Sequence, residues 1–184
     1  SASLPFLILA LWSCVWKAQG ATRSHTPCFV SQALLAEFIG TFMFMLVVLL
    51  CDLTSPMGSI AIGVSLSALT YSFGHVSEAH FNPAVTFSVC LTGKMHWFTG
   101  LLYGVVQVIG AMAGAVIAYI MAGPDVLLVA RAVGTVAQPL VGAWVVEALF
   151  CTALILVFLN VATEKNSNEP NSYYGIAIGF TVLA

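Results

Sequence analysis

Charged residues are scarce in this sequence. Asp, Glu, Lys and Arg together make up 7% of its 184 residues, whereas a soluble domain carries about 25%. A soluble chain with so little charge would precipitate, and 60% of the residues are hydrophobic. The composition therefore excludes an ordinary soluble domain and predicts an integral membrane protein. The net charge of −2 also gives no reason to expect a nucleic-acid partner.

Paired cysteines are lacking as well. The five cysteines are odd in number and no two of them form a CxxC pair: Cys14, Cys28, Cys51, Cys90 and Cys151. This spacing is typical of neither a metal site nor a disulfide framework. We interpret them as small apolar residues of membrane spans, and we expect no metal and no cofactor.

Long hydrophobic runs are what the sequence has instead. A membrane-spanning helix needs about 20 mostly apolar residues, and we expect spans at residues 31–51, 59–76, 96–122 and 140–161. A shorter run covers Pro83–Leu91, and a last run begins near Tyr173 and reaches Ala184. The run Leu4–Trp16 is too short to cross. It fits an interfacial anchor, the remnant of a signal peptide or a segment foreign to the rest.

The positive charges predict an orientation. Four of the five Lys and Arg residues fall on one side of the membrane if the spans alternate and Pro83–Leu91 enters and returns: Lys17, Arg23, Lys94 and Lys165. Arg131 alone falls on the other side. Because cytoplasmic loops carry the excess of Lys and Arg, this pattern places the N-terminus in the cytoplasm. A complete crossing by Pro83–Leu91 would destroy the pattern.

Two short words recur in the same order. IAIGVSL at Ile60–Leu66 matches IAIGFTV at Ile176–Val182, at a separation of 116 residues, and AEFIGT at Ala36–Thr41 resembles VEALFC at Val146–Cys151. A unit of three spans followed by its copy gives an inverted repeat, as in many transport proteins. We therefore divide the chain into an N-terminal extension (1–30), a first repeat (31–122), a connecting loop (123–138) and an incomplete second repeat (139–184).

One polar stretch, HVSEAHFNPAVTF, interrupts the apolar runs. Asn82 is a good N-cap and Pro83 suits the first helical position, so a helix is expected over Pro83–Leu91. Nine residues reach about 13 Å, roughly half of the hydrocarbon core. Lipid cannot satisfy the first N–H groups of such a half-helix, so they must face protein or a water-filled cavity. The alternative is an ordinary Asn-Pro helix start in a loop.

The half-helix start would have a distinct electrostatic role inside a pore. A helix N-terminus carries about half a positive charge, which repels cations and protons while still orienting water. The Asn82 amide can cap the helix with its oxygen and offer its N–H groups to a passing water or hydroxyl.

Three words resemble one known family. SEAHFNPAVT at Ser77–Thr86 closely resembles the signature loop of the aquaporin (major intrinsic protein) family. AEFIGTF at Ala36–Phe42 resembles its first span, and QVIGAMAGA at Gln107–Ala115 resembles its third. The resemblance covers residues 33–184, so the chain is identified as a member truncated before the second NPA motif. It implies an all-α membrane protein, an aquaporin-like right-handed helical bundle in which two half-helices meet at their NPA ends, usually tetrameric.

The resemblance also assigns roles to residues. Asn82, Pro83 and Ala84 would form the first NPA of the pore, with His80 and the carbonyl groups around Glu78 and Ala79 lining its cytoplasmic half. Three further residues would support the re-entrant backbone or bridge helices: Glu37, Glu147 and Gln107. A carboxylate inside a membrane is rare and needs a partner. Glu37 also fits a helix-start residue stabilised by the dipole, and His80 fits a capping or packing histidine.

Two positions depart from the family pattern. Glu78 stands where the family usually has glycine, and a carboxylate there could narrow the pore or give it a pH response. Ile62 stands where water-selective members often have an aromatic residue, which makes the constriction wider or less polar.

Together these observations predict a channel and not an enzyme. It would pass water, and small neutral solutes such as glycerol, through a lipid bilayer while excluding ions and protons. The compact 123–139 loop favours water, whereas Ile62 argues against it. The alternative is a truncated, non-conducting member that acts only by co-assembly with full-length relatives or has no function. An unrelated carrier with a broken helix is a third reading.

Overall fold

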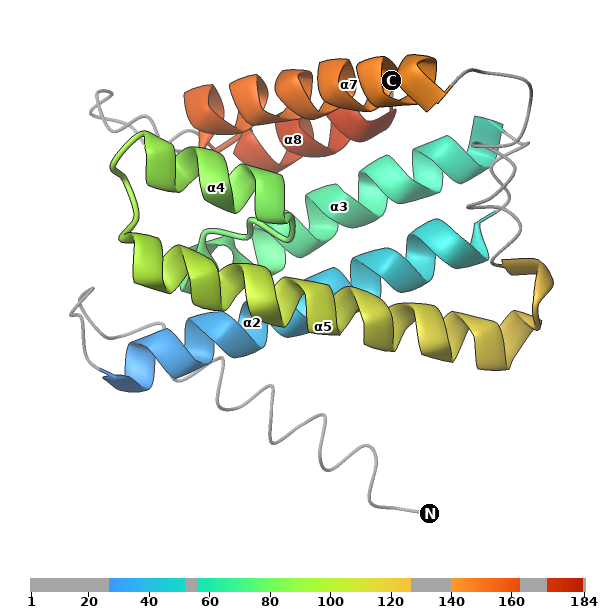
Figure 1. Cartoon of the computed structure of the whole chain (residues 1–184), viewed down its shortest axis with the longest axis horizontal. Helices are drawn as coiled ribbons and strands as arrows, with labels where there is room; N and C mark the ends of the chain where they lie inside the picture. The colour runs from blue at the N-terminus through green and yellow to red at the C-terminus, as the bar shows by residue number, and fades with distance from the viewer. Residues whose placement is uncertain (1–26, 52–55, 127–139, 163–171, 184) are drawn as a thin grey trace.

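All regular secondary structure among the described residues is helical. The computed structural model describes residues 27–51, 56–126, 140–162 and 172–183. The helices are α2 (Pro27–Leu50), α3 (Pro56–Ser77), α4 (Pro83–Leu91), α5 (Trp97–Ala122), α7 (Leu140–Val161) and α8 (Tyr174–Leu183) (Figure 1). The predicted all-α class is therefore confirmed. The run 4–16 and most of the loop 123–138 lie outside the described residues.

Two helices begin earlier than the hydrophobic runs predict. α2 starts at Pro27 and α3 at Pro56, four and three residues before the expected positions. Proline has no N–H to donate, and the first turn of a helix needs none, so proline is well suited to this position. Hydropathy alone misses these starts because the first turns are less apolar than the spans that follow.

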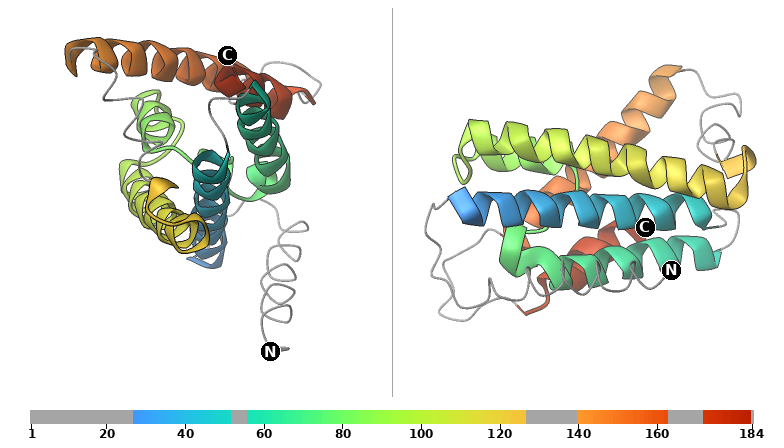
Figure 2. Two further views of the ribbon diagram at one scale, coloured as in Figure 1. Left: turned by 90° about the vertical axis from the view of Figure 1, so that its right-hand side faces the viewer. Right: turned by 90° about the horizontal axis from the view of Figure 1, so that it is seen from below.

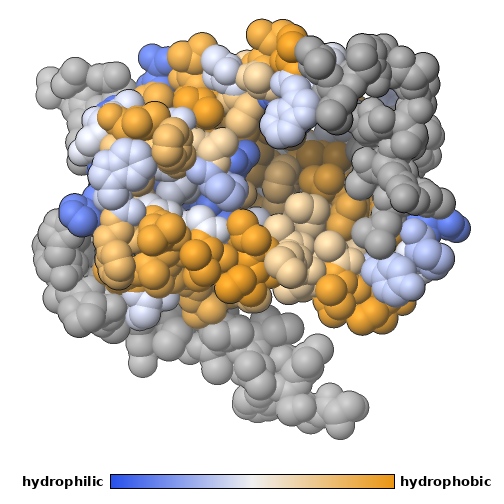
Figure 3. Space-filling view, viewed as in Figure 1, coloured by the Kyte–Doolittle hydropathy of each residue, from blue (hydrophilic) through white to orange (hydrophobic). Residues whose placement is uncertain are grey.

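Four described helices are long and apolar enough to cross a membrane: residues Val30–Leu50, Pro56–Ser77, Trp97–Ala122 and Trp144–Val161. Their outer faces expose large apolar side chains, among them Trp144 at 69% and Leu149 at 65%. Hydrophobic side chains also cover much of the face seen in Figure 3. A soluble protein would bury such faces, whereas lipid solvates them. The chain is thus an integral, multi-pass membrane protein.

Helices α2 and α5 pack closely along their length. A Cβ added to Gly110 would lie 2.6 Å from the carbonyl oxygen of Phe38, and one added to Gly114 would lie 2.8 Å from that of Phe42. Only glycine allows this approach, as in the small-xxx-small interfaces of other membrane helices. Seen from below, α2, α3 and α5 run side by side while α7 crosses them obliquely (Figure 2).

The two IAIG words meet in space. α3 packs against α8, and a Cβ added to Gly63 would lie 2.8 Å from the carbonyl oxygen of Gly179. A Cβ on Gly179 would collide in turn with the carbonyl group of Gly63. Equivalent residues of two inverted copies are expected to meet near the axis that relates them. The contact supports the repeat, while the division into units stays a prediction.

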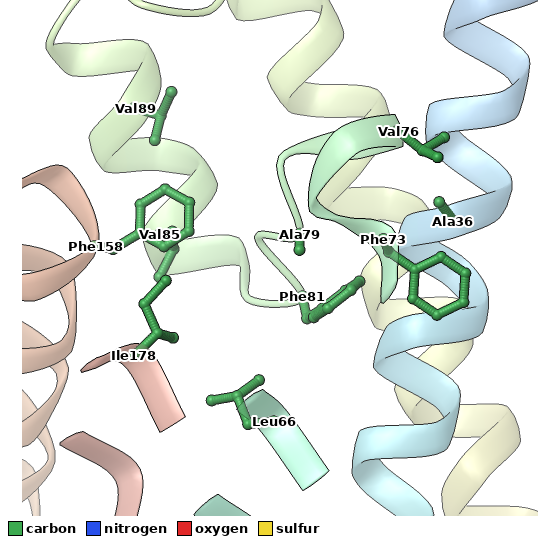
Figure 4. Packing of buried hydrophobic residues seen from close by; sticks show 10 residues of the cluster. All are labelled: Ala36, Leu66, Phe73, Val76, Ala79, Phe81, Val85, Val89, Phe158 and Ile178. Atoms are coloured by element: carbon green, nitrogen blue, oxygen red, sulfur yellow. The ribbon is translucent and has the colours of Figure 1, made fainter. Parts of the chain in front are cut away.

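Helix α4 enters the bundle and returns to the same end. Its nine residues span about 13 Å, and a short turn joins its outer end to α5, which runs back through the whole molecule (Figure 1). Around the inner end of α4, Val85 lies in an apolar cluster with Phe158 of α7 and Ile178 of α8 (Figure 4). Pro83–Leu91 is therefore re-entrant, as the charge pattern requires.

Candidate functional site

The loop between α3 and α4 has an unusual backbone. Glu78, Ala79 and Phe81 have φ angles of 70°, 52° and 47°, and none of them is glycine. Side chains disfavour this left-handed region by about 1–2 kcal/mol per residue. Such a path persists only when the surroundings determine it.

A buried carboxylate on α2 determines that path. Glu37 is fully buried and lies well inside the helix that starts at Pro27, so the alternative of a helix-start residue is wrong. Its Oε1 accepts hydrogen bonds from Ser77 Oγ (2.6 Å) and the His80 N–H (3.0 Å). Its Oε2 accepts from the Phe81 N–H (2.8 Å) and from an amide N–H of α5. Four donors thus surround the carboxylate, and two of them are loop N–H groups.

The donor from α5 is Gln107, which joins the loop to the half-helix. Its Nε2 donates to Glu37 Oε2 (2.8 Å) and to Thr86 Oγ1 (2.9 Å). Thr86, in α4, also lies 3.1 Å from His80 Nδ1. Glu37, Gln107, Thr86 and His80 therefore form one continuous buried network that joins α2, α5, α4 and the loop.

The half-helix begins as its sequence predicts. Asn82 has extended backbone angles (φ −148°, ψ 124°), its Oδ1 accepts from the Ala84 N–H at 2.8 Å, and Pro83 takes the first helical position. The Asn82 oxygen caps the helix inside the protein and not in an external loop. Among the described residues, no acceptor is paired with the amide N–H groups of Asn82.

Comparison with known proteins identifies the family. The profile described as major intrinsic protein matches residues 21–184. The chain belongs to the major intrinsic protein family. A 32% identical relative, Aquaporin NIP1-4 of Oryza sativa subsp. japonica, aligns over 83% of this chain and 57% of its own length. Aquaporin-2 of Ovis aries is 30% identical over 83% of this chain and 59% of its own length.

A third relative of this major intrinsic protein comes from a bacterium. The glycerol uptake facilitator protein-like 6 of Lactiplantibacillus plantarum is 32% identical over 80% of this chain and 70% of its own length. The chain thus spans less than two thirds of the length of the first two relatives.

His80 occupies a closed position in this major intrinsic protein. Its side chain is fully buried, with ring centroids 5.4 Å from Tyr103 and 5.2 Å from Phe158. Its backbone N–H donates to Glu37. The ring is therefore a packing residue in this conformation, the alternative given for it above. That His80 lines a pore stays a prediction.

The remaining predicted residues are spread over the molecule. Ala79 is buried in the loop, and Ile62 is 8% exposed on α3. Glu147 differs from its expectation, because its side chain is exposed on α7 and not buried. No loop comparable to that around Glu37 lies against it in the described residues. The Glu37 arrangement is therefore not reproduced at its repeat partner here.

Sequence reasoning missed four side chains of the site. Ser77 and Thr86 bond directly to the network, Tyr103 Oη donates to the Ser77 carbonyl at 3.2 Å, and Phe158 contacts the His80 ring. Ser77 and Thr86 lie within the quoted signature, so their polarity next to apolar runs was an available signal. Tyr103 and Phe158 carry no such signal, since aromatic residues are common throughout membrane spans.

Proposed function

We propose that this chain forms a membrane channel for the passive transport of water and small neutral solutes. The observation that carries the proposal is the position of the α4 start. The helix begins inside the bundle at Asn82, about 13 Å from the end at which α4 terminates. A polar helix start at this depth is tolerable only next to protein or a water-filled path.

The electrostatics of that start favour neutral solutes. The first turn of α4 carries about half a positive charge, because its N–H groups point inward without helical acceptors. The nearby carboxylate of Glu37 is occupied by four donors and buried, so it offers no site to a cation. Cations and protons are repelled, whereas water turns its oxygen toward the helix start.

The solute range follows from size and polarity. The relatives are named as aquaporins and as a glycerol uptake facilitator-like protein. For this chain we infer water and small hydroxylated solutes such as glycerol, bound transiently by the N–H groups of Asn82. Ile62 supplies an apolar wall where an aromatic residue would narrow the path. In the bilayer the functional unit is proposed to be a tetramer of this chain or an assembly with longer relatives.

Osmotic shrinkage of lipid vesicles tests the function. Vesicles carrying the wild-type chain should shrink faster in hyperosmotic buffer than empty vesicles. Asn82→Asp keeps an oxygen for the cap but removes the amide donor and adds a charge, so it should lower the rate severalfold. Asp125→Asn, at an exposed site beyond α5, is the matched control and should leave the rate unchanged. Wild-type vesicles no faster than empty ones would refute the channel.

A further inference from the structure

One buried polar atom of the network lacks a hydrogen-bond partner. Nε2 of His80 is inaccessible to solvent and makes no hydrogen bond within the described residues. The nearest charge is the carboxylate of Glu78, whose Oε2 lies 3.8 Å away and whose side chain is 41% exposed. Glu78 reaches this place from a left-handed backbone position that glycine would adopt without strain. The chain therefore has a carboxylate beside His80 at a position where a side chain is disfavoured.

At the Glu37 end of the network, the direction of each hydrogen bond is fixed. Glu37 accepts only, so the Gln107 amide must turn its nitrogen and not its oxygen toward it. The same nitrogen then donates to Thr86 Oγ1. Thr86 therefore accepts from Gln107 and has one hydrogen left to donate. That hydrogen can go to His80 Nδ1 (3.1 Å), to the carbonyl of Asn82 (3.1 Å) or, at a longer distance, to Gln107 Oε1 (3.4 Å).

The choice depends on which nitrogen of His80 carries hydrogen. With hydrogen on Nδ1, the ring donates to Thr86, and a bare Nε2 lone pair faces the Glu78 carboxylate, which repels it. With hydrogen on Nε2, Thr86 donates to Nδ1 and the N–H points toward Glu78. The Asn82 carbonyl loses little, since it already accepts from the Thr86 N–H at 3.0 Å. The tautomer with hydrogen on Nε2 therefore avoids the repulsion between the Nε2 lone pair and the Glu78 carboxylate.

We propose that Glu78 is a positioning residue that holds His80 in the tautomer with hydrogen on Nε2. Among the described residues, two other titratable groups lie beside His80: the Glu37 carboxylate of α2, which accepts from its backbone N–H, and the Tyr103 ring of α5, which packs against its imidazole. Glu37 bonds to the His80 backbone and to Gln107, and Tyr103 donates to the Ser77 carbonyl. Neither of these groups contacts Nε2. The packing of Tyr103 and Phe158 holds the ring in place, and the tautomer that it adopts there depends on residue 78.

The consequence for transport rests on the proposed function. His80 is closed against Tyr103 and Phe158, two residues before Asn82 in the loop. A ring with its hydrogen on Nε2 presents a donor toward Glu78, so in the proposed channel the exposed carboxylate, and not the closed ring, meets the solute. His80 can adopt this tautomer whether or not the protein conducts water.

The test measures the tautomer directly. In His25→Gln, His75→Gln, His96→Asn protein, His80 is the single histidine, and asparagine can replace His96 as the N-cap of α5. The protein is ¹⁵N-labelled at histidine and studied in lipid vesicles by solid-state NMR at alkaline pH, where an imidazole carries one hydrogen. We expect a single wild-type signal set with hydrogen on Nε2. Glu78→Ala should give both tautomers in comparable amounts, and Glu78→Gln an intermediate mixture.

Glu78→Ala and Glu78→Gly together separate the effect of the carboxylate from that of the backbone strain at residue 78. Alanine keeps the strained φ, whereas Glu78→Gly relieves it, so both variants should lose the single tautomer for the same reason. Asp125→Asn should match the wild type. If Glu78→Ala and Glu78→Gly keep the Nε2–H tautomer alone, the proposal is overturned. Vesicles that fail to shrink faster than empty ones would refute the channel but leave this measurement intact.

Discussion

At the scale of single residues, Glu37 explains how a loop without glycine keeps a left-handed path. Its two oxygens accept from two loop N–H groups and from two side chains, Ser77 and Gln107. Charge-assisted hydrogen bonds of this kind are roughly twice as strong as neutral ones. They offset both the strain of the loop and the desolvation of the carboxylate. These four donors stabilise the charge of Glu37, and no Lys or Arg among the described residues is bonded to it.

Glu37→Gln should destabilise the protein strongly. A glutamine has one acceptor oxygen, so its N–H₂ group must face one of the two donor pairs and leave those donors unsatisfied. The free energy of unfolding should fall by about 2–4 kcal/mol, since each buried unsatisfied group costs about 1–3 kcal/mol. Denaturant titration in mixed micelles measures it. A change as small as that of the exposed control Asp125→Asn would show that Glu37 does not support the loop.

Glu78→Gly and Glu78→Ala should separate strain from contact. Both remove the carboxylate, but only glycine adopts a φ of 70° without a steric penalty. The glycine variant should therefore be more stable than the alanine variant by about 1 kcal/mol. Thermal denaturation of the two proteins in the same detergent gives the difference. Equal stabilities would mean that residue 78 does not have the left-handed conformation in the membrane.

At the scale of elements, features that depend on neighbouring residues could be predicted from the sequence better than contacts between residues that are far apart in it. The bounds of Pro83–Leu91 could be predicted because Asn82 and Pro83 act on their own helix, and because the apolar run ends where the helix ends. The role of Gln107 could be predicted only as an inter-helix bond, because its partners lie 70 and 21 residues away. The exposure of Glu147 was not predicted, because the likeness of VEALFC to AEFIGT does not show which segment packs against the glutamate.

Glycines of α5 provide a matched pair for helix packing. Gly110→Ala places a Cβ 2.6 Å from the Phe38 carbonyl oxygen, so α2 and α5 must move apart. We expect a loss of about 1–3 kcal/mol in the free energy of unfolding. Gly104→Ala has no heavy atom within 4 Å of the new Cβ. It should instead gain up to about 1 kcal/mol from helix propensity. Unfolding of both variants in micelles measures the contrast, and equal effects would contradict the α2–α5 packing.

At the scale of the whole molecule, the re-entrant helix decides which segments share a membrane face. The end of α3, the end of α4 and the start of α5 lie at one end of the bundle, and the end of α5 lies at the other (Figure 1). The assignment of this first end to the cytoplasm stays a prediction. Four of the five charges behind it, Lys17, Arg23, Arg131 and Lys165, lie outside the described residues.

Cysteine labelling tests this arrangement. In a background without the native cysteines, His75→Cys and Lys94→Cys should react with a membrane-impermeant maleimide from one side of sealed vesicles. Asp125→Cys should react only from the opposite side. All three positions are exposed, so access to the reagent is governed by the membrane. Labelling of Lys94→Cys from the side opposite to His75→Cys would mean that α4 crosses the bilayer completely.

The long sequence separation between Glu37 and its donors has a consequence for synthesis at the ribosome. Ser77 follows Glu37 by 40 residues and Gln107 by 70. At about 5–20 residues per second, the last donor is made roughly 4–14 seconds after the carboxylate. During that interval α2 contains a carboxylate whose insertion into lipid is unfavourable by about 2.5–3.5 kcal/mol. The hydrogen-bond network around Glu37 can therefore be completed only after the third span has been synthesised and has joined the first.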